Sequence, residues 1–161
     1  MHKTRALVFA ILMACGATGA FAAARESGLA IGGEGSLYIA GANGLPTSAM
    51  LLLHLPKFPL MMGLGVTSAP GIGFTADWWF AHDNFSRFFA WYVGIGGYLS
   101  INTGSSNEVG VGGRLPIGLQ LWPAGQVLEV FFEVAPAVGV IFVPTGFDWH
   151  LQAAIGLRFW L

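Results

Sequence analysis

The chain is short of charged residues. Asp, Glu, Lys and Arg make up only 9% of its 161 residues, whereas the surface of a soluble domain usually carries roughly 25–35% of them. The formal net charge is −1, so there is no basic stripe with which to bind nucleic acid. A hydrophobic fraction of 55% excludes intrinsic disorder. Two classes remain: a membrane protein, or a single domain with an unusually apolar core.

Cysteine is almost absent as well. The single one, Cys15, lies in a segment with a basic start, an apolar run and a small-residue cleavage site ending at Ala22, which are the features of a secretory signal peptide. We therefore divide the chain into a signal peptide, 1–22, and a mature domain, 23–161, that has no cysteine for a disulfide or a thiolate metal site. An uncleaved membrane anchor and lipidation at Cys15 are the alternatives. Export of a cysteine-free chain favours a bacterial cell envelope.

No long helical hydrophobic run follows residue 24. The most apolar candidate, 127–143, contains two glutamates and a proline, and an acidic side chain at the centre of a lipid-facing helix costs roughly 2.5–3.5 kcal/mol. The chain alternates with period two instead, which is the signature of a strand. From Trp149 to Leu161, every odd-numbered residue is apolar and the even-numbered residues are mixed.

The same alternation recurs along the chain and predicts eight strands, separated by turns rich in Gly, Pro and Asn. The strands are expected at 28–40, 47–55, 60–68, 71–80, 87–101, 108–121, 127–141 and 149–161. Short turns between successive strands give an antiparallel meander, and an even strand number suits a barrel. The predicted fold class is an all-β, eight-stranded antiparallel up-and-down barrel.

Each predicted strand has one bulky face and one small face. Leu, Ile, Val, Phe and Trp gather on the first face, whereas the second carries most of the strand glycines and the interior charge candidates. The lumen of an eight-stranded barrel is just wide enough for side chains, so we expect the bulky face to point outward. An apolar exterior in turn requires a closed barrel, because lipid cannot satisfy an open sheet edge. These features predict a transmembrane barrel.

Aromatic residues gather near both ends of the predicted barrel, as expected for rings at two membrane interfaces. One rim surrounds the turn near 80–89 and includes Trp122 and Trp160. The other rim holds Phe147 and Trp149. The alternative interpretation is the aromatic core of a soluble sandwich.

The layout resembles the small eight-stranded outer-membrane barrels of the OmpA/OmpX type over residues 25–161. Gly156, followed three and five residues later by Phe159 and Leu161, is similar to the assembly signal of that class, with Leu161 standing where an aromatic is usual. The resemblance implies a bacterial outer-membrane location. It also implies contact with outer-membrane lipid and with the outer-membrane assembly machinery. A fold does not by itself specify a function.

Polar side chains on the inward face are expected to form a network that plugs the lumen. Arg114, Glu133 and Arg158 fall at similar height on the last three predicted strands, so we expect Glu133 to bridge both arginines. Glu129 is expected nearer Gln120. The full expected network is Arg114, Glu133, Arg158, Glu129, Gln120, Glu34 and Asp77.

Catalytic signatures are few. His54, His82 and His150 lie in separate segments, and no serine occupies a nucleophile elbow. The Gly-x-Gly pairs fall in strands rather than before helices, which argues against phosphate loops. We therefore expect a non-enzymatic protein without cofactor or metal, with a structural or surface-interaction role toward an external ligand or a host surface. A narrow channel or small-molecule transporter is the main alternative; a soluble ligand-binding barrel and an enzyme are the others.

Deleting residues 159–161 should block outer-membrane assembly in cells, while the truncated chain still refolds in detergent. If these residues only added apolar area, the loss of Leu161 alone would cost on the order of 1.5–3 kcal/mol. Outer-membrane levels measured by immunoblot, beside refolding followed by circular dichroism, separate the two effects. Unchanged outer-membrane levels would show that these residues are not an assembly signal.

Overall fold

The described part of the chain consists of β-strands and turns. The computed structural model describes residues 28–41, 47–68, 70–104, 107–142 and 145–161, and the expected signal peptide with Cys15 lies outside them. Within these ranges no helix is long and apolar enough to cross a membrane. The strands are β1 (Ala30–Gly41), β2 (Ser48–His54), β3 (Leu60–Thr67), β4 (Gly71–Asn84), β5 (Phe89–Thr103), β6 (Asn107–Arg114), β7 (Ile117–Leu121), β8 (Leu128–Phe142) and β9 (Thr145–Trp160).

β6 and β7 are two parts of one wall strand. Both pair antiparallel with β5 on one side and with β8 on the other. Only Leu115 and Pro116 separate them, and proline interrupts a ladder because it has no N–H. The nine elements therefore form the eight antiparallel strands that the sequence predicts.

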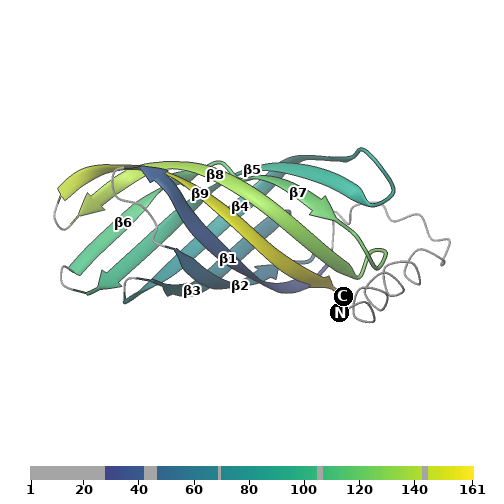
Figure 1. Ribbon diagram of the computed structural model, residues 1–161, viewed down its shortest axis with the longest axis horizontal. Helices are drawn as coiled ribbons and strands as arrows, with labels where there is room; N and C mark the ends of the chain where they lie inside the picture. Colours follow the sequence, from purple (N-terminus) through teal and green to yellow (C-terminus); the bar gives the residue numbers. More distant parts are fainter. Residues whose placement is uncertain (1–27, 42–46, 69, 105–106, 143–144) are drawn as a thin grey trace, which may run out of the picture.

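The barrel closes between β1 and β9. Consecutive wall strands pair along the chain, and Ala30 of β1 lies opposite Trp160 of β9. Figure 1 shows the strands running obliquely around the long axis, with β1 and β9 side by side. We call the end that holds the start of β1 and the end of β9 the terminal end, and the opposite end the distal end. Closure pairs every wall strand on both sides, so the sheet has no free edge.

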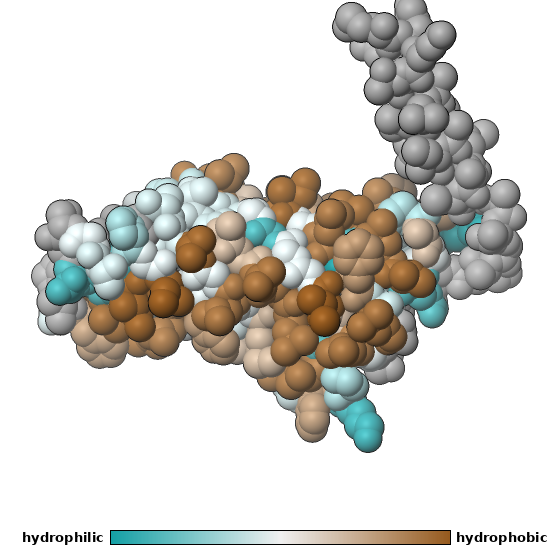
Figure 2. All heavy atoms as spheres, turned by 90° about the horizontal axis from the view of Figure 1, so that it is seen from below, coloured by the Kyte–Doolittle hydropathy of each residue, from teal (hydrophilic) through white to brown (hydrophobic). Residues whose placement is uncertain are grey.

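The two strand faces point as the sequence predicts. Bulky residues of the outer face are exposed, including Leu51 at 74% and Ile155 at 62%. Figure 2 shows one side of the molecule, where hydrophobic residues, in brown, cover much of the wall. In the described part of the chain, the interior holds six buried charged residues together with small and aromatic side chains. The wall is therefore apolar on its outer surface, which is polar in a soluble barrel.

Two strands run four residues further than the sequence pattern predicts. β4 continues through residues 82–84, which read as a turn, because they pair with β5 beyond a register shift between Trp79 and Ala81. β9 begins at Thr145, where the sequence predicts a turn, because Thr145 pairs with Phe142 of β8. Pairing with a neighbouring strand outweighs local composition at both places.

Two tryptophans that were expected at the aromatic rim near residues 80–89 lie inside the barrel. Trp122 and Trp160 are 1% and 2% exposed, and their ring centroids are 5.8 Å apart. Trp160 follows Arg158 by two residues, so the pleat carries both side chains inward. Trp149, expected at the other rim, is 47% exposed on the outer face.

Replacing Gly118 by Ala should lower the free energy of unfolding by about 1–3 kcal/mol, the usual cost of overpacking. The reason is that a methyl group at Gly118 would meet the ring of Tyr92 inside the barrel. The matched control is Gly35→Ala, because nothing lies within 4 Å of a methyl group at Gly35. Denaturant titration in detergent micelles measures both. Equal stability of the two variants would contradict tight packing of the lumen.

Candidate functional site

The candidate site is the set of polar side chains that lines the lumen. All seven residues of the expected network lie on inward-facing positions of their strands. Six of the seven are buried, whereas Glu34 is partly exposed. These six are Asp77, Arg114, Gln120, Glu129, Glu133 and Arg158.

Arg114 makes the central set of contacts. Its Nη2 donates to Oε1 of Glu133, and its Nε lies 3.3 Å from Oδ1 of Asp77. Its Nη1 lies 3.5 Å from Oε1 of Gln152, whose amide donates in turn to the Ser36 hydroxyl at 2.9 Å. Arg114 thus ties β6 to β4, β8 and β9. Its charge is compensated inside the barrel, where an uncompensated charge would cost several kcal/mol.

Arg158 pairs with Glu129 rather than with Glu133. Its Nη1 donates to Oε1 of Glu129 at 2.5 Å. The register of β8 and β9 sets Glu129 opposite Arg158 and sets Glu133 opposite Ala154, so the neighbouring carboxylate is that of Glu129. Two ion pairs, Arg114–Glu133 and Arg158–Glu129, therefore replace the expected bridge from Glu133 to both arginines.

Tyr92 connects the two ion pairs. Its hydroxyl donates to Oε2 of Glu133 at 2.6 Å and accepts from Nη2 of Arg158 at 3.4 Å. The ring is fully buried. The sequence pattern places Tyr92 on the inward face, but it gives no sign that the hydroxyl would join the charged groups. The ion pairs are consequently one continuous network.

Glu129 accepts hydrogen bonds from three side chains. Besides Arg158, Gln120 donates its Nε2 hydrogen at 2.9 Å, in agreement with the expected proximity of Gln120 and Glu129. Trp160 donates its indole N–H at 2.7 Å. Glu129 is 0% exposed, so these donors take the place of water around its carboxylate.

Arg158 also lies against aromatic rings. Its Cζ is 3.5 Å from the ring centroid of Phe131 and 5.0 Å from that of Trp79. Cation–π attraction is strongest where the cation is desolvated. Trp79 stacks in turn on Tyr92, with 4.2 Å between centroids. The lumen is therefore partly aromatic, whereas the sequence led us to expect small and paired polar groups.

A second polar cluster lies toward the distal end. The Tyr98 hydroxyl donates to Oδ2 of Asp148 at 2.5 Å, and Nδ1 of His150 lies 3.1 Å from the same oxygen. All three side chains are buried. Sequence reasoning treated His150 as isolated and missed this cluster. The available signal was the alternation of Asp148, His150 and Gln152, which places three polar side chains in one inward row of β9.

Glu34 is the least enclosed residue of the network. Its carboxylate interacts electrostatically with Glu133 and Arg114. It also borders a hollow of about 510 Å³ in the wall, together with Gly33 and Gly35. These glycines provide no side chain to cover Glu34 from outside.

The three histidines that the structure describes are distributed over the barrel. His54 lies at the terminal end, with Nδ1 2.9 Å from the Gly28 carbonyl oxygen. His82 is exposed on β4, and His150 belongs to the distal cluster. Among the residues that the structure describes, no group of three or more His, Cys, Asp or Glu side chains is arranged to hold a metal ion.

Replacing Glu133 by Ala should lower the free energy of unfolding by roughly 3–5 kcal/mol, because it leaves Arg114 and Tyr92 without their shared carboxylate. The matched control is Glu34→Ala, which removes a carboxylate from the same lumen at a partly exposed position and should cost less. Denaturant titration of both variants in the same micelles provides the comparison. A cost for Glu133→Ala no larger than that for Glu34→Ala would contradict the central role of Glu133.

The network spans the lumen from Asp77 on β4 to Arg158 on β9, and this arrangement can cross-link strands and oppose the passage of ions.

Comparisons of the chain with protein-family models, with curated proteins and with solved structures find no match.

Proposed function

We propose that the chain is an integral β-barrel of the bacterial outer membrane, with a plugged lumen and a structural or surface-interaction role without catalysis. One observation carries this proposal: the wall is apolar outside and charged inside. A soluble monomer rarely exposes a contiguous apolar patch larger than a few hundred Å². In a bilayer, the same surface would be matched by hydrocarbon.

The exposed apolar side chains are distributed around the whole barrel. Every wall strand contributes at least one large hydrophobic residue that is more than one third exposed. A continuous belt of this kind favours lipid on all sides over a single protein partner. Representatives from successive wall strands are Ile31, Leu51, Leu64, Phe74, Ile95, Leu119, Phe132 and Ile155.

Strand length supports the same proposal. A tilted membrane-spanning strand needs roughly 9–11 residues, and β1, β4, β5, β8 and β9 contain 12 to 16. β2 and β3, with 7 and 8 residues, fall short of this length.

The finer assignment, to the OmpA/OmpX type of small barrel, rests on the strand number and on the resemblance of the last residues. Phe159 and Leu161 are 53% and 68% exposed on the outside, where the assembly machinery would reach them. Gly156 faces the ring of Phe131, so a larger residue would not fit there. Residues 1–22 would direct export, and the partners would be outer-membrane lipid and an external ligand or host surface.

A narrow cation channel is the second candidate. The described part of the lumen contains more carboxylates than guanidinium groups, which favours cations over anions. The ion pairs oppose conduction, because they cross-link the strands through the lumen. The carboxylates are those of Glu34, Asp77, Glu129, Glu133 and Asp148, and the guanidinium groups are those of Arg114 and Arg158.

The protein should sediment with outer membranes and migrate faster on a gel when unheated than when boiled, because a closed hydrogen-bonded barrel resists detergent until it is heated. Membrane fractionation and electrophoresis test this expectation. In planar bilayers, the plugged lumen should give no steady conductance. Recovery in the soluble periplasmic fraction after osmotic shock would refute the membrane assignment, and large steady conductance would refute the plug.

A further inference from the structure

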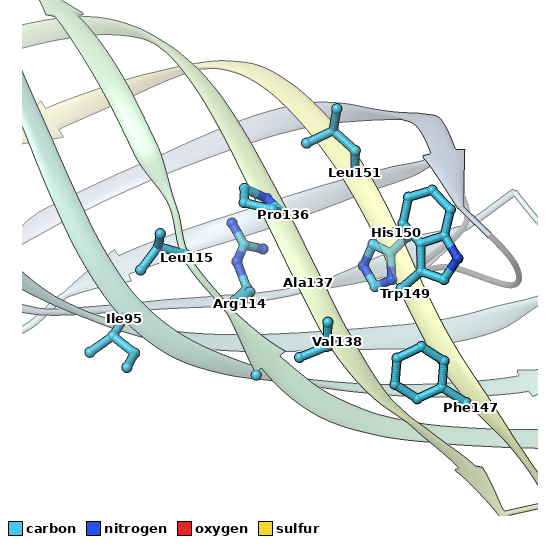
Figure 3. Close-up of a pocket in the computed structure, with 11 residues that line it drawn as sticks. Ile95, Arg114, Leu115, Pro136, Ala137, Val138, Phe147, Trp149, His150 and Leu151 are labelled. Atoms are coloured by element: carbon cyan, nitrogen blue, oxygen red, sulfur yellow. The ribbon is translucent and has the colours of Figure 1, made fainter.

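A hollow of about 660 Å³ lies on the outer wall, across β5, β6, β8 and β9. In Figure 3, Ile95 and Leu115 lie on one side of it, Phe147 and Trp149 on the other, and Val138 between them. These side chains are apolar and point away from the lumen, so the hollow opens toward whatever surrounds the barrel. We call it the wall groove.

Part of the floor of the wall groove is bare backbone, at Gly113. Gly113 of β6 points outward, and its register partner on β5 is another outward glycine, Gly97. Gly97 is paired in turn with Ala76 of β4. A methyl group at Gly113 would meet only the carbonyl oxygen of Gly96, at 3.8 Å. Three neighbouring strands therefore present small residues in one outward row.

The wall beside the groove lacks two strand hydrogen bonds. Leu115 donates its N–H to the Pro136 carbonyl at 2.9 Å, and Gly94 donates to the Pro116 carbonyl at 2.8 Å. In an antiparallel pair of this type, each residue normally returns a bond to the other, but proline has no N–H to return. The sheet next to the groove consequently has fewer inter-strand hydrogen bonds than a regular ladder.

The dimensions of the groove restrict what can occupy it. Leu115 lines the groove and Val111 is the next outward residue on the other side of Gly113; their Cα atoms are about 14 Å apart along an extended strand. Their side chains narrow this gap below the width of a helix, which is about 10–12 Å with its own side chains. A second barrel would present a convex wall that cannot enter a groove this narrow. A single acyl chain meets neither obstacle.

The groove also has the direction that a lipid requires. Phe147 and Trp149 lie near the start of β9 at the distal end, whereas Leu115 lies in the middle of the strand formed by β6 and β7. Tryptophan favours the interface between head groups and hydrocarbon. A lipid with its head group near Trp149 would direct its acyl chain over Gly113 toward Leu115.

We propose that the wall groove binds one acyl chain of a membrane lipid at a fixed position. This inference rests on the proposed function, because acyl chains surround the barrel only if it lies in a bilayer. It adds that one lipid is held in place at this groove.

The test uses the purified full chain, reconstituted into phosphatidylcholine vesicles that contain a small share of phosphatidylcholine with a diazirine in its acyl chain. After illumination, mass spectrometry locates the labelled residues. Labelling at Leu115 and Val138 should be several-fold higher than at Leu51, which also faces outward and is even more exposed but is remote from the groove. Gly113→Leu should remove this enrichment by filling the groove, whereas Gly35→Leu, the same change at another outward glycine, should preserve it.

Each result separates the two proposals. Even labelling of all outward residues would overturn the acyl-chain site and leave the membrane assignment intact. Failure of the chain to enter vesicles, with outward residues unlabelled, would overturn the proposed function itself. Faster migration of unheated Gly113→Leu on a gel verifies that this variant is folded, and the comparison of Leu115 with Leu51 in the unmodified chain does not depend on it.

Discussion

The narrow lumen of an eight-stranded barrel is the constraint on which the rest of this structure depends. Such a barrel has room inside for side chains and little else, so each inward charge must find its partner among the neighbouring side chains. Arg114 and Arg158 are each buried against a carboxylate. One face of every strand must fill this space. The other face, which carries most of the bulky side chains, must therefore point outward.

The polar groups of the interior are distributed along its length. The terminal end contains an apolar cluster that includes Trp79, Tyr92, Trp122 and Trp160. The Arg158–Glu129 ion pair lies among these rings, and the Trp160 N–H donates to Glu129. Removing water from around the ion pairs strengthens the attraction between their charges. The aromatic residues therefore protect the charges that they adjoin.

The sequence predicts the faces of the strands well and their partners less well. Period-two alternation identifies Glu129, Glu133 and Arg158 as inward residues without any knowledge of the turns. Which carboxylate meets Arg158 depends on the register of β8 and β9, and a register shift would bring a different residue opposite Arg158. The register sets Glu129 there, a fact that composition and alternation do not contain. The role of Tyr92 was missed for a related reason, since its hydroxyl meets Glu133 from another wall strand across the lumen.

The pairing of β1 with β9 has a consequence for how the chain folds. This contact joins residues near 30 to residues near 160, so it closes the longest loop in the molecule and carries the largest entropic cost of any strand pairing here. We therefore expect it to form last, after the hairpins have assembled. Until then β1 is an open edge, but Gly32, Gly33 and Gly35 make it a poor strand former. The strand that pairs last is therefore poorly suited to pairing with a strand of another molecule, which lowers the risk of aggregation before the barrel closes.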